Sequence, residues 1–110
     1  MKTFAENLSA LPTLDGLSLL HLLDDQGVTQ STIENKPGTQ GSFRVYHFVA
    51  TKWDGLGPEA AHEALELFAE HTEDAKQHPG KHPNIDRLVT LVTENGQLRV
   101  KQVFASSALT

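Results

Sequence analysis

The sequence predicts an α+β fold in which a small, mostly antiparallel sheet is covered on one face by about three helices. Residues 17–23 and 28–35 are two strand-like segments joined by a short turn. Three segments with helical periodicity follow near 43–53, 58–77 and 84–94, and the alternating segment 97–104 comes last. Because neighbouring strands pair through short turns, the late strand is expected to join an edge of their sheet.

Length and composition favour one folded domain over residues 1–110. A chain of 110 residues is the usual size of a domain with a single core. Its 38% hydrophobic and 21% charged residues lie far from the composition of disordered chains. Only residues 105–110 are expected to form a frayed tail.

The first two elements have recognisable boundary signals. Thr3 and Glu6 have the spacing of a capping box, which predicts a short helix that Pro12 ends. Gly27 follows two aspartates and suits the left-handed position of a hairpin turn between 17–23 and 28–35.

The next two predicted helices differ in how clear their signals are. In 43–53 the apolar residues recur at helical spacing and Ser42 is a good N-cap, although valine and aromatic alternation also suits a strand. Pro58 starts the clearest helix of the chain, which is expected to continue to about Gln77.

The last two elements follow that helix. Residues 84–94 suit a helix ended by Asn95 and Gly96, but the same Asn-Gly pair would suit a hairpin. Residues 97–104 alternate apolar and basic side chains, as a half-exposed strand does.

Charge and cysteine content exclude several classes of function. The formal net charge of −5 disfavours nucleic acid and anionic membranes as partners. The chain has no cysteine, so disulfides, thiolate ligands and a cysteine nucleophile are excluded. The first residues resemble no signal peptide, and we expect a cytoplasmic protein.

One segment, residues 71–86, concentrates the polar chemistry of the chain. Imidazole and carboxylate groups at a core boundary are ligands that Zn²⁺, Fe²⁺ or Mn²⁺ accepts. Lysine and arginine beside them could hold a small anionic ligand. The candidate metal ligands are His71, Asp74, His78 and His82. The candidate ligand-binding residues add Lys81, Asp86 and Arg87 to these four.

Other interpretations of the same residues remain open. The histidines can be structural, with His78 and His82 preceding prolines in a rigid turn. Histidine beside aspartate can also transfer protons, yet the chain has no nucleophile motif, so enzymatic activity is not favoured. The turn at 37–42 could bind an anion through its free amides, although a plain linking turn is the simpler interpretation.

A binding domain is therefore the first hypothesis for function. The second is a non-enzymatic interaction module or homo-oligomer in which the alternating segment 97–104 offers a free sheet edge.

Three segments carry a resemblance to a known family. They are Ile33-Glu34-Asn35-Lys36-Pro37-Gly38, Glu70-His71-Thr72-Glu73-Asp74-Ala75 and His78-Pro79-Gly80-Lys81-His82-Pro83-Asn84-Ile85-Asp86-Arg87-Leu88. With these segments the chain resembles a bacterial family of domains of unknown function, over nearly its whole length. The resemblance implies a small, soluble, single-domain bacterial protein and brings no activity, ligand or catalytic residue with it.

Overall fold

A computed structural model describes residues 2–12, 14 and 16–104 of the chain. Most of the helices lie between the second and third strands along the chain. The elements are α1 (Phe4–Ser9), β1 (Leu17–Leu23), β2 (Thr29–Glu34), α2 (Gln40–Trp53), α3 (Pro58–Phe68), α4 (Glu70–Gln77), α5 (Pro83–Thr93) and β3 (Arg99–Phe104).

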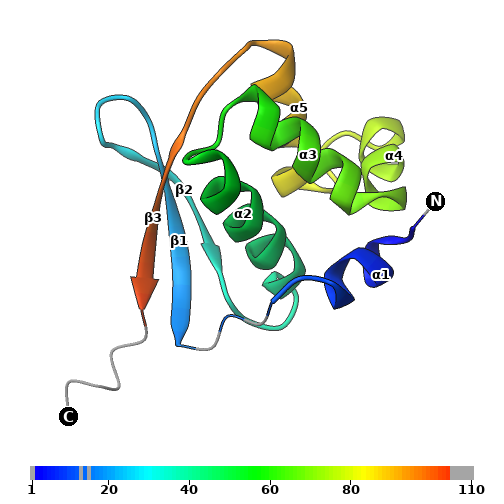
Figure 1. Cartoon of the computed structure of the whole chain (residues 1–110). Coiled ribbons are helices and arrows are strands. Elements are labelled where there is room, and N and C mark those ends of the chain that lie inside the picture. The colour runs from blue at the N-terminus through cyan, green and yellow to red at the C-terminus, as the bar shows by residue number, and fades with distance from the viewer. Residues whose placement is uncertain (1, 13, 15, 105–110) are drawn as a thin grey trace.

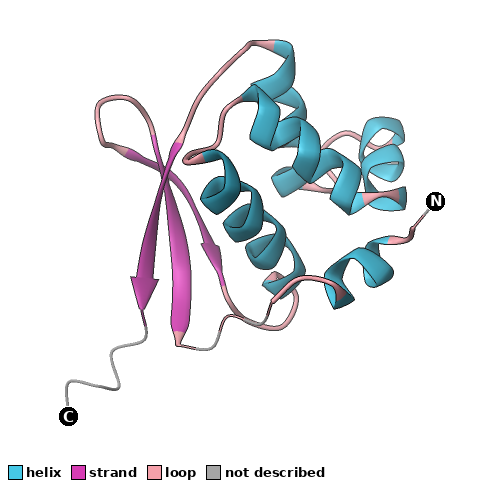
Figure 2. Cartoon of the chain, in the orientation of Figure 1, coloured by secondary structure: helices cyan, strands magenta, loops and turns pink. Residues whose placement is uncertain are grey.

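The strands form one antiparallel sheet in the order β2-β1-β3, which confirms the predicted α+β class. Leu20 and Leu22 of the central strand are fully buried, and they pair with Ile33 and Ser31 on β2. β3 lies at one edge of the described sheet, as expected for a strand that returns after the helices. Figure 2 shows the strands side by side with the helices grouped on one face.

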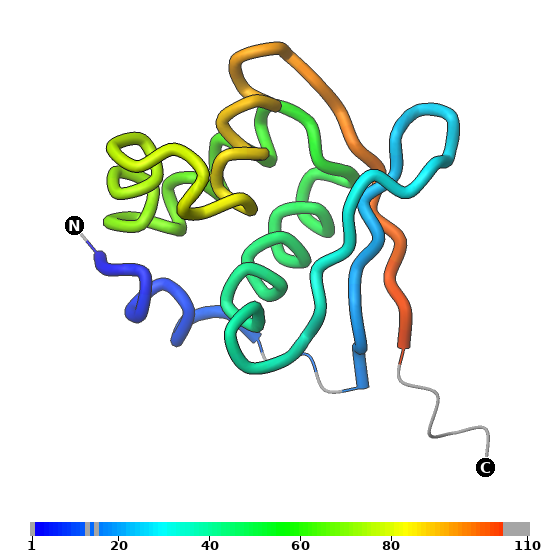
Figure 3. Tube along the Cα trace, turned by 180° about the vertical axis from the view of Figure 1, so that it is seen from behind, coloured from blue at the N-terminus to red at the C-terminus, as the bar shows by residue number. Residues whose placement is uncertain are grey.

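The helices form two layers over that face. Figure 1 and the opposite view in Figure 3 both show α2 against the sheet, with α3, α4 and α5 beyond it. Phe43, Tyr46 and Val49 of α2 are fully buried, because α2 lies between the sheet and the outer helices. α1 is joined to the outer layer by the Asn7 side chain, which donates to the Leu67 carbonyl at 2.9 Å.

Several local predictions are confirmed by the structure. The Thr3 hydroxyl accepts from the Glu6 amide at 3.2 Å and the Glu6 carboxylate accepts from the Thr3 amide at 2.8 Å, which completes the capping box. Gly27 has a φ of 80° in the β1–β2 turn. Both ambiguous segments are helical, as α2 and α5. The predicted tail at 105–110 lies outside the described residues.

The prediction of one continuous helix from Pro58 to about Gln77 is wrong. The helix breaks at Ala69, whose φ of 52° is left-handed, and α4 starts in a new direction. The break leaves the Leu65 carbonyl without its helical donor, because the Ala69 amide turns to Glu66. The buried Thr72 hydroxyl replaces that donor at 2.6 Å, so tertiary packing compensates the lost helical bond.

Ser42 is not the N-cap of α2 as predicted. The helix begins at Gln40, and Thr39 is its N-cap residue. The chain from Lys36 already turns tightly, since the Thr39 amide donates to the Lys36 carbonyl at 3.1 Å. The Thr39 hydroxyl donates to the Glu34 carbonyl at 2.7 Å and makes no cap bond. The first amides of α2 therefore have no side-chain cap.

Candidate functional site

Asp74 on α4 is the centre of the predicted histidine and aspartate cluster. Its Oδ2 atom lies 2.6 Å from His82 Nε2 and 3.0 Å from Lys81 Nζ. His78 Nε2 lies 3.8 Å from the other carboxylate oxygen. The turn between α4 and α5 thus brings three predicted site residues to a carboxylate that is one third exposed.

These contacts change the acidity of Asp74. The hydrogen bond from His82, together with the Lys81 ammonium group, lowers the pKa of Asp74 to about 2. Asp74 is therefore ionised throughout the neutral range, where it fixes the orientation of the His82 ring.

His71 reaches the same place from the first turn of α4. Its ring lies 5.8 Å from the His82 ring and meets Phe4 edge-on, with 4.9 Å between the centroids. The predicted metal set of His71, Asp74, His78 and His82 is thus brought into one neighbourhood. However, the described part of the chain holds no group of three or more His, Asp or Glu side chains arranged to bind a metal ion. The histidines contact Asp74 or aromatic rings instead.

Asp86 and Arg87 lie apart from Asp74. Asp86 Oδ2 accepts from the Gly80 amide at 2.9 Å, so it stabilises the turn before α5. Arg87 points toward the sheet, where it donates to the Ser31 hydroxyl at 2.8 Å and to the Tyr46 hydroxyl at 3.0 Å. A third bond of 2.9 Å reaches Asn84 Oδ1.

A cavity of about 660 Å³ joins this cluster to the start of α2. His71, Lys81 and His82 line one side, and Thr39, Gln40, Gly41 and Ser42 from the start of α2 line the other. The remaining lining residues are Phe4, Leu8, Gly38, Phe68, Pro83, Asn84 and Ile85. Residues from both segments that the sequence marked separately, 71–86 and the turn at 37–42, therefore line one cavity.

The cavity combines electropositive groups with an apolar wall. The uncapped amides of α2 and the positive end of its helix dipole favour an anion at this point. Phe4 and Phe68 stack at 5.2 Å and form the apolar side. Phe4 also covers Gly41 closely, since a Cβ atom at Gly41 would lie 3.0 Å from its ring. Sequence reasoning missed Phe4, because nothing local links it to residues 71–86, and it did not single out Asn84 although this residue lies within that segment.

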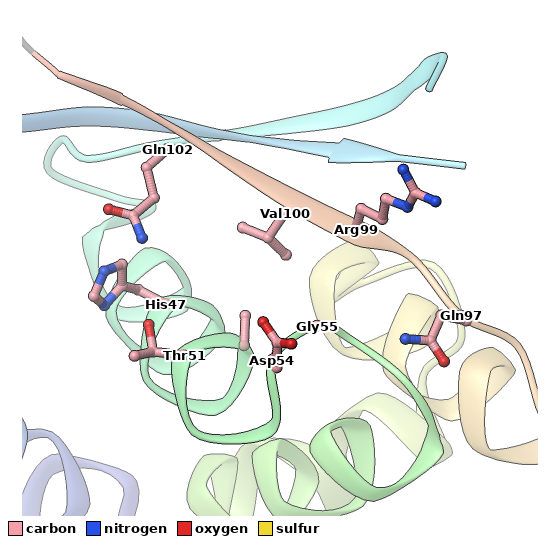
Figure 4. A pocket seen from close by; sticks show the side chains of 9 residues that line it. His47, Thr51, Asp54, Gly55, Gln97, Arg99, Val100 and Gln102 are labelled. Carbon is pink, nitrogen blue, oxygen red and sulfur yellow. The ribbon is translucent and has the colours of Figure 1, made fainter. Parts of the chain in front are cut away.

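A second cavity, of about 520 Å³, lies at the opposite end of α2. Figure 4 shows it between α2 and β3, with His47, Thr51 and Asp54 on one side and Gln97 and Gln102 on the other. Sequence reasoning missed this cavity entirely, because its residues come from segments with no shared motif.

No curated protein and no solved structure matches the chain. No helix among the described residues has the length and hydropathy needed to span a membrane. A family described as "Uncharacterized protein conserved in bacteria (DUF2322)" matches residues 4–102. Since the match covers almost the whole 110-residue chain, the protein belongs to this bacterial family, in agreement with the resemblance seen in its sequence.

Proposed function

We propose that this protein binds a small organic anion in the cavity between α2 and the α4–α5 turn. One observation carries the proposal: Lys81, His82 and His71 face the uncapped start of α2 across one cavity of about 660 Å³. Donor groups from two directions can then surround one anionic group, as small-ligand sites usually require.

The charges of the site suit an anion of low charge. The Lys81 ammonium group is partly balanced by Asp74 at 3.0 Å, so the net attraction of the site for an anion comes mainly from the α2 dipole. This balance is too weak to attract a polyanion such as nucleic acid to a chain with a net charge of −5.

Asn84 adds a neutral donor whose orientation is fixed. Arginine can only donate, so the Asn84 atom that faces Arg87 must be the carbonyl oxygen Oδ1. The Asn84 backbone carbonyl is also occupied, because it accepts from the Tyr46 hydroxyl. The Nδ2 group is what the Asn84 side chain can still offer to a ligand in the cavity.

The apolar wall sets the class of ligand. Phe4, Phe68 and Ile85 would be poor neighbours for a bare inorganic ion but would pack against a small hydrocarbon or aromatic body. The proposed ligand is therefore a carboxylate or phosphate monoester with an apolar part.

Isothermal titration with phenyl phosphate and inorganic phosphate tests the proposal. We expect phenyl phosphate to bind more tightly, because its ring buries apolar surface against the phenylalanines. Ser42→Asp should abolish binding by placing a carboxylate in the first turn of α2 within the cavity. The same change should leave the melting temperature unchanged or higher, since an acidic residue is favourable at a helix N-terminus.

Matched variants separate binding from other effects. Ser42→Asn introduces a side chain of nearly the same shape as Ser42→Asp but without its charge, and this variant should keep at least part of the affinity for phenyl phosphate. His62→Gln changes an exposed histidine of α3, next to Glu66 and outside the cavity, and should bind as the unchanged protein does. The proposal is contradicted if neither phenyl phosphate nor inorganic phosphate binds. It is also contradicted if folded Ser42→Asp binds phenyl phosphate as tightly as the unchanged protein does.

A second candidate function is self-association through β3. It is favoured by the position of β3 at an edge of the described sheet and by Phe104, which is 65% exposed. Arg99 and Lys101 on the same strand would oppose pairing with a second copy. Light scattering at tens of micromolar protein tests this candidate. A monomer excludes it, and a dimer that becomes monomeric in the variant Phe104→Ser supports it.

A further inference from the structure

The second cavity exists because α2 does not cover the inner face of β3 completely. Gln102 and Val100 pair with Leu20 and Leu22, so they point toward the helical side of the sheet. The two leucines are fully buried, but Gln102 is exposed and Val100 is only half-buried. The uncovered strip of β3 is the floor of a cavity of about 520 Å³.

The walls of this cavity are held in place by the backbone. Leu56 and Leu98 exchange two backbone hydrogen bonds of 2.9 Å, which fasten the α2–α3 turn to the chain before β3. The Gln97 side chain packs against Gly55 and Gly57, where an added Cβ atom would lie 3.1 and 3.0 Å from its amide atoms. The glycines therefore leave the space in which the Gln97 amide is seated.

The charge of the cavity comes from the end of α2. Asp54 is the C-cap of α2, with a left-handed φ of 55°, and its carboxylate lies next to the negative end of the helix dipole. Figure 4 shows this carboxylate pointing into the cavity toward Val100, whereas the guanidinium group of Arg99 is turned away from it. Burial lowers the pKa of His47, so this histidine adds no positive charge near pH 7.

We infer that this cavity binds a small primary ammonium ion. Asp54 supplies the charge and the Thr51 hydroxyl supplies a further acceptor, whereas the Gln97 amide turns its nitrogen toward the cavity. The N–H donors of an ammonium group match the carboxylate and hydroxyl oxygens. The two ends of α2 then bind ligands of opposite charge, which is the polarity that its dipole favours.

The test is a nuclear magnetic resonance titration of the full chain with ethylammonium chloride. Backbone amide signals of Thr51, Gly55 and Gln97 are expected to shift and to saturate. Tetramethylammonium chloride at the same ionic strength carries the same charge without N–H donors, and we expect it to bind at least about tenfold more weakly.

Asp54→Asn is the matched variant. Asparagine adopts the left-handed conformation as readily as aspartate, so the turn and the fold should be retained. We expect the affinity for ethylammonium to fall about tenfold or more, because one charged hydrogen bond is worth roughly 1.5–3 kcal/mol. The inference is overturned by unsaturable shifts, by equal binding of both cations, or by an Asp54→Asn variant that binds as well as the unchanged protein.

Discussion

The hydroxyl group of Tyr46 connects α2, α5 and β2 through a partly buried polar network. Tyr46 is fully buried, donates to the Asn84 carbonyl and accepts from Arg87 at 3.0 Å, while Arg87 also bonds Ser31. The change Tyr46→Phe removes only the oxygen. The ring that lies 5.7 Å from the Arg87 guanidinium carbon is retained, so the change isolates the two hydrogen bonds.

The expected loss of stability is the sum of the contributions of the two hydrogen bonds that the change removes. A neutral hydrogen bond contributes about 1 kcal/mol and one to a charged group roughly 1.5–3 kcal/mol, so we expect a loss of about 2.5–4 kcal/mol. With an unfolding entropy of roughly 2.1 cal/mol/K per residue, a 110-residue chain should melt about 11–17 °C lower.

Calorimetric melting of Tyr46→Phe, Arg87→Met and the double variant measures this network. Because the two side chains share a hydrogen bond, the double variant should lose less stability than the sum of the single losses, by about 1 kcal/mol. A decrease below roughly 2 °C for Tyr46→Phe, or full additivity of the two changes, would refute the reasoning.

Three further predictions concern the single residues Tyr46, Asp74 and Ala69. Burial raises the pKa of Tyr46, the one tyrosine of the chain, to about 12, so phenolate absorbance should appear well above the usual pH of 10. The buried phenol binds its proton more tightly in the folded state, so its contribution to stability should be lost as pH rises from about 10 to 12. The His82 and Lys81 contacts lower the pKa of Asp74 to about 2, so ionised Asp74 stabilises the fold above the pKa of an unfolded aspartate. The difference in melting temperature between the unchanged protein and Asp74→Asn should therefore be largest above pH 4 and vanish toward pH 2. A difference that stays constant with pH would contradict this linkage. Ala69→Gly should raise the free energy of unfolding by up to about 1 kcal/mol, because glycine adopts the φ of 52° without strain. A lower melting temperature of this variant would show that the backbone at Ala69 is unstrained.

The parts of the fold that the sequence predicts are those with local signals. The Thr3–Glu6 capping box and the turn at Gly27 depend on neighbouring residues, and both are confirmed. The break at Ala69 has no such signal, since no glycine or proline interrupts the helical pattern there. It is compensated by the bond from Thr72 to Leu65, which only the packed structure provides.

The candidate site shows the same division between local and long-range information. Asp74 and His82 are close in sequence, and their proximity could be predicted from the helix and the turn between them. Arg87 was expected beside them, but it donates to Tyr46 on α2 and to Ser31 on β2 instead. The start of α2, which forms the other half of the cavity, joins the site only through tertiary packing.

The strand order β2-β1-β3 has a consequence for synthesis of the protein in the cell. β2 follows β1 directly in the chain, but the other neighbour of β1, β3, is made only after all four helices α2 to α5 have been synthesised. Until then, one side of this leucine-rich strand has unpaired backbone groups and can pair with strands of other nascent chains. We therefore expect chains truncated before residue 99 to aggregate or to bind chaperones.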